Sequence, residues 1–419
     1  MATDPLLAGL ADLRCVPAAV EAWWLGAARA ATGCASDEEA LERLVPAVQA
    51  LSDGFTRARP ARMSRYGDDA RARAAYALWF GTQAWVRTRL PLAMAHAQHG
   101  WRPRAGALRV LDIGAAGGAA GLSAATWLRM QGATAVELVA LDHSAGALRD
   151  VEALAREALP GALAPTVVTH ACDARTPSRW PAAVEGTYDL VLVSFTLNEL
   201  FDAEDEAGTH WLGQMLRRVA PGGLLLVLEP AVKERALSLL ERCATLVEQG
   251  QGHAWGPQHG PGAWQPAADA RTWPHEVRRW TMPPSVERLN RTLWRSASEL
   301  AYAYVLLGGE PPPAPAADAP PWRLASALHK GHGKHAWLAY DRAGALVTLE
   351  LQDRDATRAE REVLATLERG DLVALAPAPR AMGSTLRPAR ARDVVRVTSP
   401  EGTRDPWQGA GAGGPTPAA

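Results

Sequence analysis

The part of the chain that most constrains its fold is residues 108–123, Leu-Arg-Val-Leu-Asp-Ile-Gly-Ala-Ala-Gly-Gly-Ala-Ala-Gly-Leu-Ser. An apolar run that ends in an acid and passes through glycines into an alanine-rich segment predicts a buried parallel strand, a sharp turn and a helix. The N–H groups at the start of such a helix face whatever lies at the turn. The glycines that would let the backbone approach a ligand are Gly114, Gly117 and Gly118. This pattern predicts a nucleotide-binding turn.

Three ligand classes use a turn of this kind, and single residues separate them. A phosphate-binding loop needs Gly-Lys-Ser or Gly-Lys-Thr, and residues 108–123 contain no lysine. A dinucleotide fingerprint needs a glycine where Ala116 stands. Asp112, two residues before the first glycine, suits a ligand with an ammonium or sulfonium group, because opposite charges attract in a partly dry cleft. S-adenosylmethionine (SAM) carries both groups, and a glycine turn without any ligand is the alternative.

Acidic residues also follow the next two predicted strands. The second strand, residues 136–141, is followed by Asp142, which is placed to accept hydrogen bonds from two ribose hydroxyls. The third strand, residues 166–169, leads to Asp173. The Asp173 side chain either reaches the adenine amine or caps a turn. We therefore expect Asp112, Asp142 and Asp173 to join the glycines in binding the cofactor.

The fourth predicted strand, residues 188–193, runs into Ser-Phe-Thr-Leu-Asn-Glu-Leu at residues 194–200. Ligands of open α/β sheets lie beyond the carboxyl ends of the strands, so this segment should border the transferred group. Asn198 and Glu199 either orient and deprotonate an acceptor or cap the following helix. No Asn-Pro-Pro-Tyr sequence occurs here, which weakens the hypothesis of a methyltransferase for adenine amines.

Strands and helices continue to alternate after this point. A helix at residues 211–219, a Pro-Gly-Gly turn and an apolar fifth strand at residues 224–228 follow. The alternation predicts an α/β fold with a parallel sheet and right-handed crossovers. A further strand at residues 301–307 is expected to join the same sheet.

The chain before the glycine turn has a different pattern. Residues 1–105 show apolar residues at helical spacing and few strand-like alternations, which predicts a helical N-terminal region. An aromatic-rich helix in this region should stop near Pro91. Six arginines crowd residues 57–73 and form either a solvated face or a contact for phosphate.

Composition excludes several classes of function. Lys+Arg 44 against Asp+Glu 45 gives a net charge of -1, so no overall basic field indicates nucleic acid, while a local patch stays open. The four cysteines form no C-x-x-C pair and indicate free thiols rather than a disulfide framework or a metal site. The most apolar stretch, residues 223–232, is too short to span a bilayer, and no secretory signal precedes the first helix. We expect a cytoplasmic, soluble protein with no membrane partner and no bound metal.

These stretches together resemble a class I SAM-dependent methyltransferase, with its Rossmann-like sheet. More narrowly, they are similar to the methyltransferase-like assembly factors of the small ribosomal subunit in mitochondria and bacteria. The stretches that carry the narrower resemblance are residues 75–91, 111–114, 189–200, 228–230 and 329–335. The resemblance implies SAM as cofactor and ribosomal RNA, or the assembling small subunit, as partner.

One departure from that family concerns cysteines. Its members carry Cys-Pro-His, Cys-Pro and Trp-Cys-His after the fifth strand, a pattern associated with an iron–sulfur cluster. Here residues 256–263 and 273–275 contain no cysteine, and the histidines that remain, His253, His259 and His275, match no zinc spacing. We expect a cluster-free relative in which this His/Trp/Gly-rich loop packs over the sheet.

The expected domains follow from these patterns. A methyltransferase domain at residues 106–309, with the inserted loop 251–279, follows the helical region; residues 310–321 form a Pro/Ala linker. A small β-unit at residues 322–398 and a disordered tail at residues 399–419 complete the chain. Lys330 and Lys334, before the first long strand of this unit, either contact phosphate or belong to a surface loop.

Three functions are compatible with the sequence. The first is a methyltransferase that acts on ribosomal RNA or on the assembling small ribosomal subunit. The second is a non-catalytic ribosome assembly factor that keeps the SAM fold as a scaffold, which the alanine at position 116 and the lost cysteines allow. The third is a methyltransferase for a small molecule or a peptide, which the net charge of -1 favours.

Overall fold

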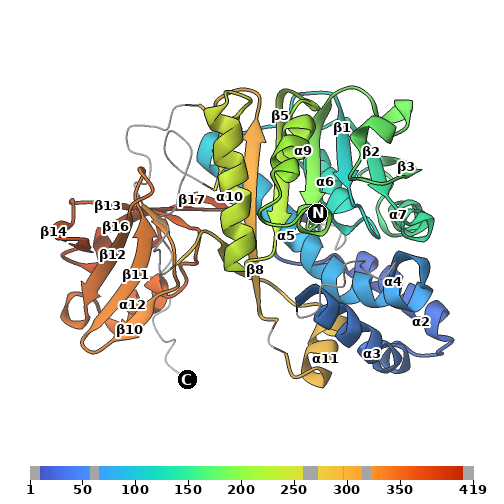
Figure 1. The fold of residues 1–419 in the computed structure, drawn as a ribbon. Coiled ribbons are helices and arrows are strands. Elements are labelled where there is room, and N and C mark those ends of the chain that lie inside the picture. Colours follow the sequence, from blue (N-terminus) through green and yellow to red (C-terminus); the bar gives the residue numbers. More distant parts are fainter. Residues whose placement is uncertain (1–9, 57–65, 258–271, 296, 314–321, 409–419) are drawn as a thin grey trace.

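A computed structural model of the protein describes residues 10–56, 66–257, 272–295, 297–313 and 322–408. Three structural regions follow one another along the chain. A helical region, drawn in blue in Figure 1, lies below a mixed sheet covered by helices. A second, smaller β-rich region, drawn in orange and red, stands beside helix α10 (Lys233–Glu248). The helical region therefore lies at one end of the strands of the main sheet.

The N-terminal region is helical, as its apolar spacing predicts. Two of its helices end at glycines in the left-handed conformation, Gly33 after α2 and Gly100 after α5, because glycine adopts positive φ without a Cβ clash. Its elements are α2 (Ala18–Thr32), α3 (Asp37–Thr56), η1 (Tyr66–Asp68), α4 (Ala70–Tyr76), the π-helix η2 (Ala77–Gly81) and α5 (Thr82–His99).

The prediction that this last helix stops near Pro91 is wrong. Helix α5 continues through Pro91 to His99. Proline inside a helix costs about 3 kcal/mol. Most residues from 82 to 95 are buried, on all sides of the helix, and this burial outweighs the cost of proline.

The main sheet confirms the Rossmann-like α/β fold predicted from the sequence. Its strand order is β3-β2-β1-β4-β5-β8-β6, with β7 also paired to β8, and the first five of these strands are parallel. The order 3-2-1-4-5 is that of a doubly wound sheet, which changes direction between β1 and β4. Strand β8 is antiparallel to β5. The strands are β1 (Ala107–Ile113), β2 (Ala135–Asp142), β3 (Thr166–Ala171), β4 (Tyr188–Ser194), β5 (Val219–Glu229), β6 (His253–Gly256), β7 (Glu276–Arg279) and β8 (Glu299–Gly308).

Both faces of this sheet are buried, which explains its continuous apolar strands. Val110 belongs to the core shared with the N-terminal helices, while its neighbour Leu111 belongs to the core under α9 and α10. Successive residues of one strand thus serve opposite layers. The remaining elements around the sheet are α6 (Ala119–Met130), α7 (Ala145–Ala158), η3 (Pro177–Arg179), η4 (Ala182–Val184), α8 (Leu197–Leu200), α9 (Glu206–Leu216) and α11 (Pro284–Thr292).

The C-terminal region is a nine-stranded sheet of short strands around its own core. Its strand order is β14-β15-β12-β11-β9-β13-β16-β17, and β10 pairs with β11. Its elements are β9 (Trp322–Leu324), β10 (His329–Gly331), β11 (Lys334–Tyr340), β12 (Leu346–Gln352), η5 (Asp353–Asp355), α12 (Arg358–Leu364), β13 (Leu372–Leu375), β14 (Arg380–Met382), β15 (Thr385–Arg387), η6 (Ala391–Asp393), β16 (Val394–Ser399) and β17 (Gly402–Arg404).

The expectation of disorder from residue 399 onward is wrong for residues 399–408. Strand β17 pairs with β16, and Trp407 Nε1 donates a hydrogen bond to the Val394 carbonyl oxygen at 2.7 Å. Arg14 Nε forms an ion pair with Glu401 Oε1 at 2.5 Å. Glycine and proline, whose content suggested disorder, occur here in tight turns. Residues 409–419 lie outside the described residues.

A buried network of charges joins β7 to the C-terminal region. Arg278 is 1% exposed and forms ion pairs with Glu276, at 2.7 Å, and with Asp371. Arg323 on β9 pairs with Glu276 as well. Burial alone would raise the pKa of Glu276, but Arg323 and Arg278 outweigh it and hold that pKa below its usual value. The two sheets are therefore fixed to each other by ionised groups.

In the part of the chain that the structure describes, no helix combines the length and apolar character needed to cross a membrane.

Candidate cofactor site

The predicted glycine turn forms at the carboxyl end of β1 and faces the N-terminal helices (Figure 1). Gly114 and Gly118 have φ values of 74° and 80°, a region that favours glycine. Each also lacks room for a side chain: a Cβ on Gly114 would lie 2.2 Å from Thr196 Oγ1, and one on Gly118 would lie 2.8 Å from Val151 Cγ1. These two glycines are required by the turn itself.

Gly117 is different, because a Cβ there would meet no atom within 4 Å. Gly117 also lines a cavity beside the turn. Ala116, which stands in a glycine position of the dinucleotide fingerprint, adopts a φ of 46°. A left-handed conformation costs an alanine about 1–2 kcal/mol. In this conformation the Ala116 N–H donates a hydrogen bond to Asp142 Oδ2.

Asp142 lies at the end of β2, where the sequence predicts it, and touches the turn directly. Its Oδ2 accepts a hydrogen bond from the Ala116 N–H at 2.9 Å, and its Oδ1 accepts one from the Ser144 N–H at 2.8 Å. The residue is 7% exposed. Oδ1 also lies 3.3 Å from His143 Nδ1, while Oδ2 keeps a further lone pair that can accept a hydrogen bond from a hydroxyl group.

Asp112 is enclosed on the other side of the turn. It is fully buried, and its Oδ2 accepts a hydrogen bond from the Gly121 N–H of α6 at 3.0 Å. Burial raises the pKa of Asp112 to about 7, the Gly121 N–H opposes this, and the charge of Asp142 adds to it. Oδ1 has no hydrogen-bond partner. In this arrangement a ligand reaches Asp112 only if the turn moves, so its predicted direct contact with the cofactor stays a prediction.

Asp173 lies on the exposed rim beyond β3. Its Oδ1 accepts a hydrogen bond from the Arg175 N–H at 2.9 Å, so of its two predicted roles the turn cap is formed. The preceding Cys172 donates its N–H to the Asp142 carbonyl oxygen at 2.9 Å, which holds the end of β3 beside that of β2. A contact between Asp173 and adenine remains a prediction.

Asn198 and Glu199 fall in α8, directly after β4. The Asn198 N–H donates to Glu229 Oε1 at 3.1 Å, and its Nδ2 donates to the Phe195 carbonyl oxygen at 3.2 Å. Phe195 has a φ of 58°, so Asn198 supports a strained turn. Glu199 is exposed. The structure thus brings Asn198 and Glu199 to the carboxyl edge of the sheet, together with Asp142 and the glycines, and their catalytic role is a prediction.

Sequence reasoning missed two residues at this edge. Glu229, at the end of β5, is 2% exposed and caps α8 by accepting a hydrogen bond from the Asn198 N–H. The sequence pattern that could have pointed to it is an acid between an apolar strand and Pro230. Thr196 donates its hydroxyl to the Ile113 carbonyl oxygen at 3.1 Å and so ties β4 to β1. No local pattern marks Thr196, because its partner lies 83 residues away.

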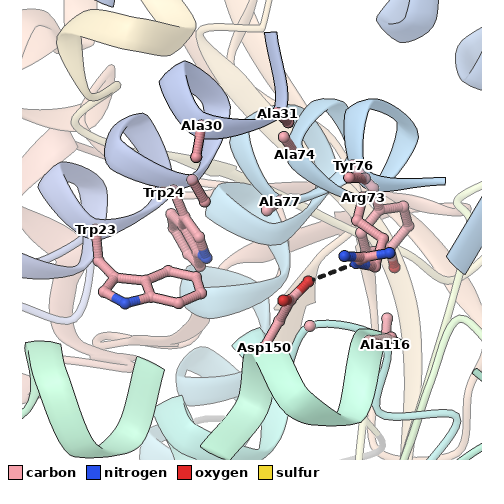
Figure 2. Close-up of a pocket in the computed structure, with 14 residues that line it drawn as sticks. Trp23, Trp24, Ala30, Ala31, Arg73, Ala74, Tyr76, Ala77, Ala116 and Asp150 are labelled. Carbon is pink, nitrogen blue, oxygen red and sulfur yellow. Dashed lines mark hydrogen bonds and ion pairs between the residues drawn. The ribbon is translucent and has the colours of Figure 1, made fainter. Parts of the chain in front are cut away.

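A cavity of about 310 Å³ lies beside the turn, between helices α2, α4 and α7. Figure 2 shows its aromatic wall and, across the gap, the ion pair of Arg73 with Asp150, whose Nε and Oδ2 atoms are 2.7 Å apart. The cavity touches the turn only through Ala116 and Gly117 and includes neither Asp142 nor Asn198. The other residues that line it are Trp23, Trp24, Ala27, Ala30, Ala31, Ala70, Ala74, Tyr76, Ala77 and Ala147.

The predicted arginine run is only partly described. Arg71 donates Nε to the Ala31 carbonyl oxygen at 3.3 Å, and Arg73 is paired with Asp150; the other four arginines lie outside the described residues. Lys334 of the C-terminal region pairs with Glu350 at 2.5 Å, while Lys330 lies on the exposed strand β10. Lys330 and Lys334 therefore belong to a β-hairpin rather than to an irregular loop.

The histidines of the inserted loop do not gather around a metal in the described part of the chain. His253 is exposed on β6, and His275 Nδ1 donates a hydrogen bond to the Trp273 carbonyl oxygen at 3.0 Å. His259 lies outside the described residues. Burial and the nearby Arg369 lower the pKa of His275 to about 4. Across residues with described positions, no three His, Cys, Asp or Glu side chains are arranged for a metal ion.

Comparison with known proteins returned no matching family model and no matching curated protein. Solved structures that resemble the chain include a candidate class I SAM-dependent methyltransferase of Listeria monocytogenes, with 11% identity, a TM-score of 0.34 and coverage of 70% of this chain and 83% of that one. Magnesium protoporphyrin IX methyltransferase of Synechocystis, with SAM bound, has 14% identity, a TM-score of 0.31 and coverage of 62% and 96%.

A third structure is a candidate rRNA methylase of Clostridium thermocellum, with 9% identity, a TM-score of 0.26 and coverage of 48% of this chain and 86% of that one. Values this low leave the chain's own strand order and site geometry as the evidence for what it does. That evidence is a doubly wound sheet whose carboxyl edge joins a glycine turn, a fixed carboxylate and a polar segment after the fourth strand.

Proposed function

We propose that this chain is a SAM-dependent methyltransferase whose cofactor lies across the glycine turn. The observation that carries the proposal is the Asp142 carboxylate, held by two backbone N–H groups at the end of β2 and beside the switch point of the sheet. Such a carboxylate fits the two ribose hydroxyls of SAM. The open side of Gly117 leaves space for the approach of the ligand to the backbone.

Phosphate-bearing cofactors fit this site less well. Asp142 places a carboxylate against the turn, and it would repel a pyrophosphate. No lysine is present in residues 108–123 to neutralise phosphate charge. SAM carries a positive sulfonium and no phosphate, so the charge of the site favours it.

The residues of this chain would contribute alignment rather than activation. SAM supplies an already activated methyl group when it is bound. Asp142 and the turn would fix the ribose end, and Asn198 and Glu199, at the neighbouring strand, would border the acceptor and orient or deprotonate it. The helices α2 and α4 line a cavity that reaches Ala116 and Gly117 and would exclude water from that side of the turn.

For the acceptor we propose ribosomal RNA or the assembling small ribosomal subunit, which rests on the resemblance of residues 75–91, 189–200 and 228–230 to assembly factors of that subunit. A non-catalytic scaffold is the second candidate, favoured by the enclosed Asp112 and the strained Ala116. A small-molecule or peptide acceptor is the third, favoured by the net charge of -1.

Calorimetric titration of the protein with SAM tests the proposal. We expect the wild type to bind and Asp142→Ala to lose about tenfold or more of its affinity, because two charge-assisted hydrogen bonds disappear. Absence of binding by the wild type would refute the proposal of an enzyme and favour the non-catalytic scaffold. Methyl transfer to stripped ribosomal RNA, compared with transfer to total small metabolites, then identifies the class of acceptor.

A further inference from the structure

Arg87 on helix α5 is a half-buried cation beside Phe195, which follows the end of β4. Its guanidinium lies over the ring of Phe195, with 5.3 Å between Cζ and the ring centre. Nη2 donates to Gln83 Oε1 at 3.0 Å, and Nε has no hydrogen-bond partner. Among the residues described, no Asp or Glu forms an ion pair with Arg87, and the groups that interact with its charge are Tyr302 and Tyr76.

This arrangement is costly for the protein on its own. Burial lowers the pKa of Arg87 to about 10, and Tyr302 and Tyr76 only partly oppose that effect. A cation withdrawn from water without a counter-ion destabilises the fold. Arg73, at the cavity beside the turn, is paired with Asp150. Among the described residues, Arg87 thus keeps a charge that no carboxylate neutralises.

The position of Arg87 follows from contacts that lead to the glycine turn. Phe195, under its guanidinium, precedes Thr196, whose hydroxyl binds the Ile113 carbonyl oxygen at 3.1 Å. Gly114 packs so closely on Thr196 that a Cβ would lie 2.2 Å from its Oγ1. Phe195 and Thr196 thus link Arg87 to the glycine turn.

We propose that Arg87 binds the carboxylate at the amino-acid end of SAM, a role that rests on the function proposed above. A guanidinium offers planar paired donors that match a carboxylate, which a lysine cannot reproduce. The unused Nε and the terminal nitrogens of Arg87 supply these donors. The ligand then provides a counter-ion that none of the described residues supplies.

The test compares two ligands that differ only at this end. S-adenosylhomocysteine carries the amino-acid carboxylate, and 5′-methylthioadenosine has the same adenosine and thioether without it. We expect Arg87→Met to weaken S-adenosylhomocysteine binding about tenfold to hundredfold in calorimetry and to leave 5′-methylthioadenosine binding within about twofold. Arg87→Lys should recover part of the loss, and Arg71→Met, an exposed arginine on α4, serves as the matched control.

Each other result overturns the assignment. Equal losses for both ligands would make Arg87 a structural residue, and no loss for either would remove it from the site. Loss of an RNA acceptor with unchanged S-adenosylhomocysteine binding would place a phosphate at Arg87 instead. Failure of the wild type to bind either ligand would refute the proposed function itself. Thermal unfolding of Arg87→Met without ligand should show no loss of stability, since the variant removes an unpaired charge.

Discussion

Replacing Gly114 by alanine should destabilise the protein far more than the same change three residues later. Two costs add at Gly114. Its φ of 74° is a left-handed conformation that costs an alanine about 1–2 kcal/mol. The new Cβ would also lie 2.2 Å from Thr196 Oγ1 and 2.6 Å from its Cγ2, and overpacking of this kind costs about 1–3 kcal/mol. The expected loss in the free energy of unfolding is about 2–5 kcal/mol.

Urea unfolding followed by circular dichroism measures this loss, and Gly117→Ala is its control. A Cβ at Gly117 meets nothing within 4 Å, and its φ lies outside the left-handed region, so we expect a change within about 0.5 kcal/mol. Both variants add one methyl group to the same turn. Only the surroundings differ.

A second substitution separates strain from overpacking. Thr196→Ala removes the two nearest of the three Thr196 atoms that the new Cβ would meet and leaves the third, Cβ at 2.9 Å, so in the Gly114→Ala background it should restore about 1–2 kcal/mol. In the wild-type background the same change should cost about 1 kcal/mol, because the hydrogen bond to Ile113 is lost. A Gly114→Ala variant as stable as Gly117→Ala, or a double variant no better than the single one, would refute the packing described here.

Two further predictions concern buried charges. Arg278→Met should lower the free energy of unfolding by about 3–5 kcal/mol in urea titration, because Glu276 and Asp371 stay buried without their partner; a loss below 1 kcal/mol would contradict the network. Since burial raises the pKa of Asp112 from 3.8 to about 7, the folded state binds more protons than the unfolded state between these values, and stability should fall as pH rises there. Asp112→Asn should remove about 1.4 kcal/mol per pH unit of that slope, and unchanged slopes in wild type and variant would refute the raised pKa.

Much of the site could be predicted from sequence because it depends on local order along the chain. A strand followed by an acid and glycines has few structural solutions, so the turn with Gly114 and Gly118 and the acid Asp142 lie where the pattern indicates. The expected order of alternating strands and helices is also present. In the C-terminal region β11, β12 and β13 were predicted, while the six-residue β16 was missed. Strands of three residues such as β9 and β14 were missed as well, because they are too short to show alternation.

Where the sequence misleads, long-range packing decides. Pro91 signals a helix end, yet α5 continues because its surroundings bury it on all sides. Residues 399–408 have the composition of a loose tail, yet β17 pairs with β16 and Trp407 binds Val394. In both cases contacts with other elements outweigh the local preference of the chain.

The sequence by itself determined the sheet, its glycine turn and the acids at the strand ends, because periodicity and turn chemistry act between neighbouring residues. Only the tertiary structure decided what each of these groups faces. In the structure, Asp112 accepts a hydrogen bond from the Gly121 N–H and Asp142 accepts one from the turn. Glu229 accepts one from the Asn198 N–H. The tertiary structure also set Arg87 over the ring of Phe195. These contacts join residues far apart in the chain, and the packing of whole elements, rather than any local pattern, sets their distances.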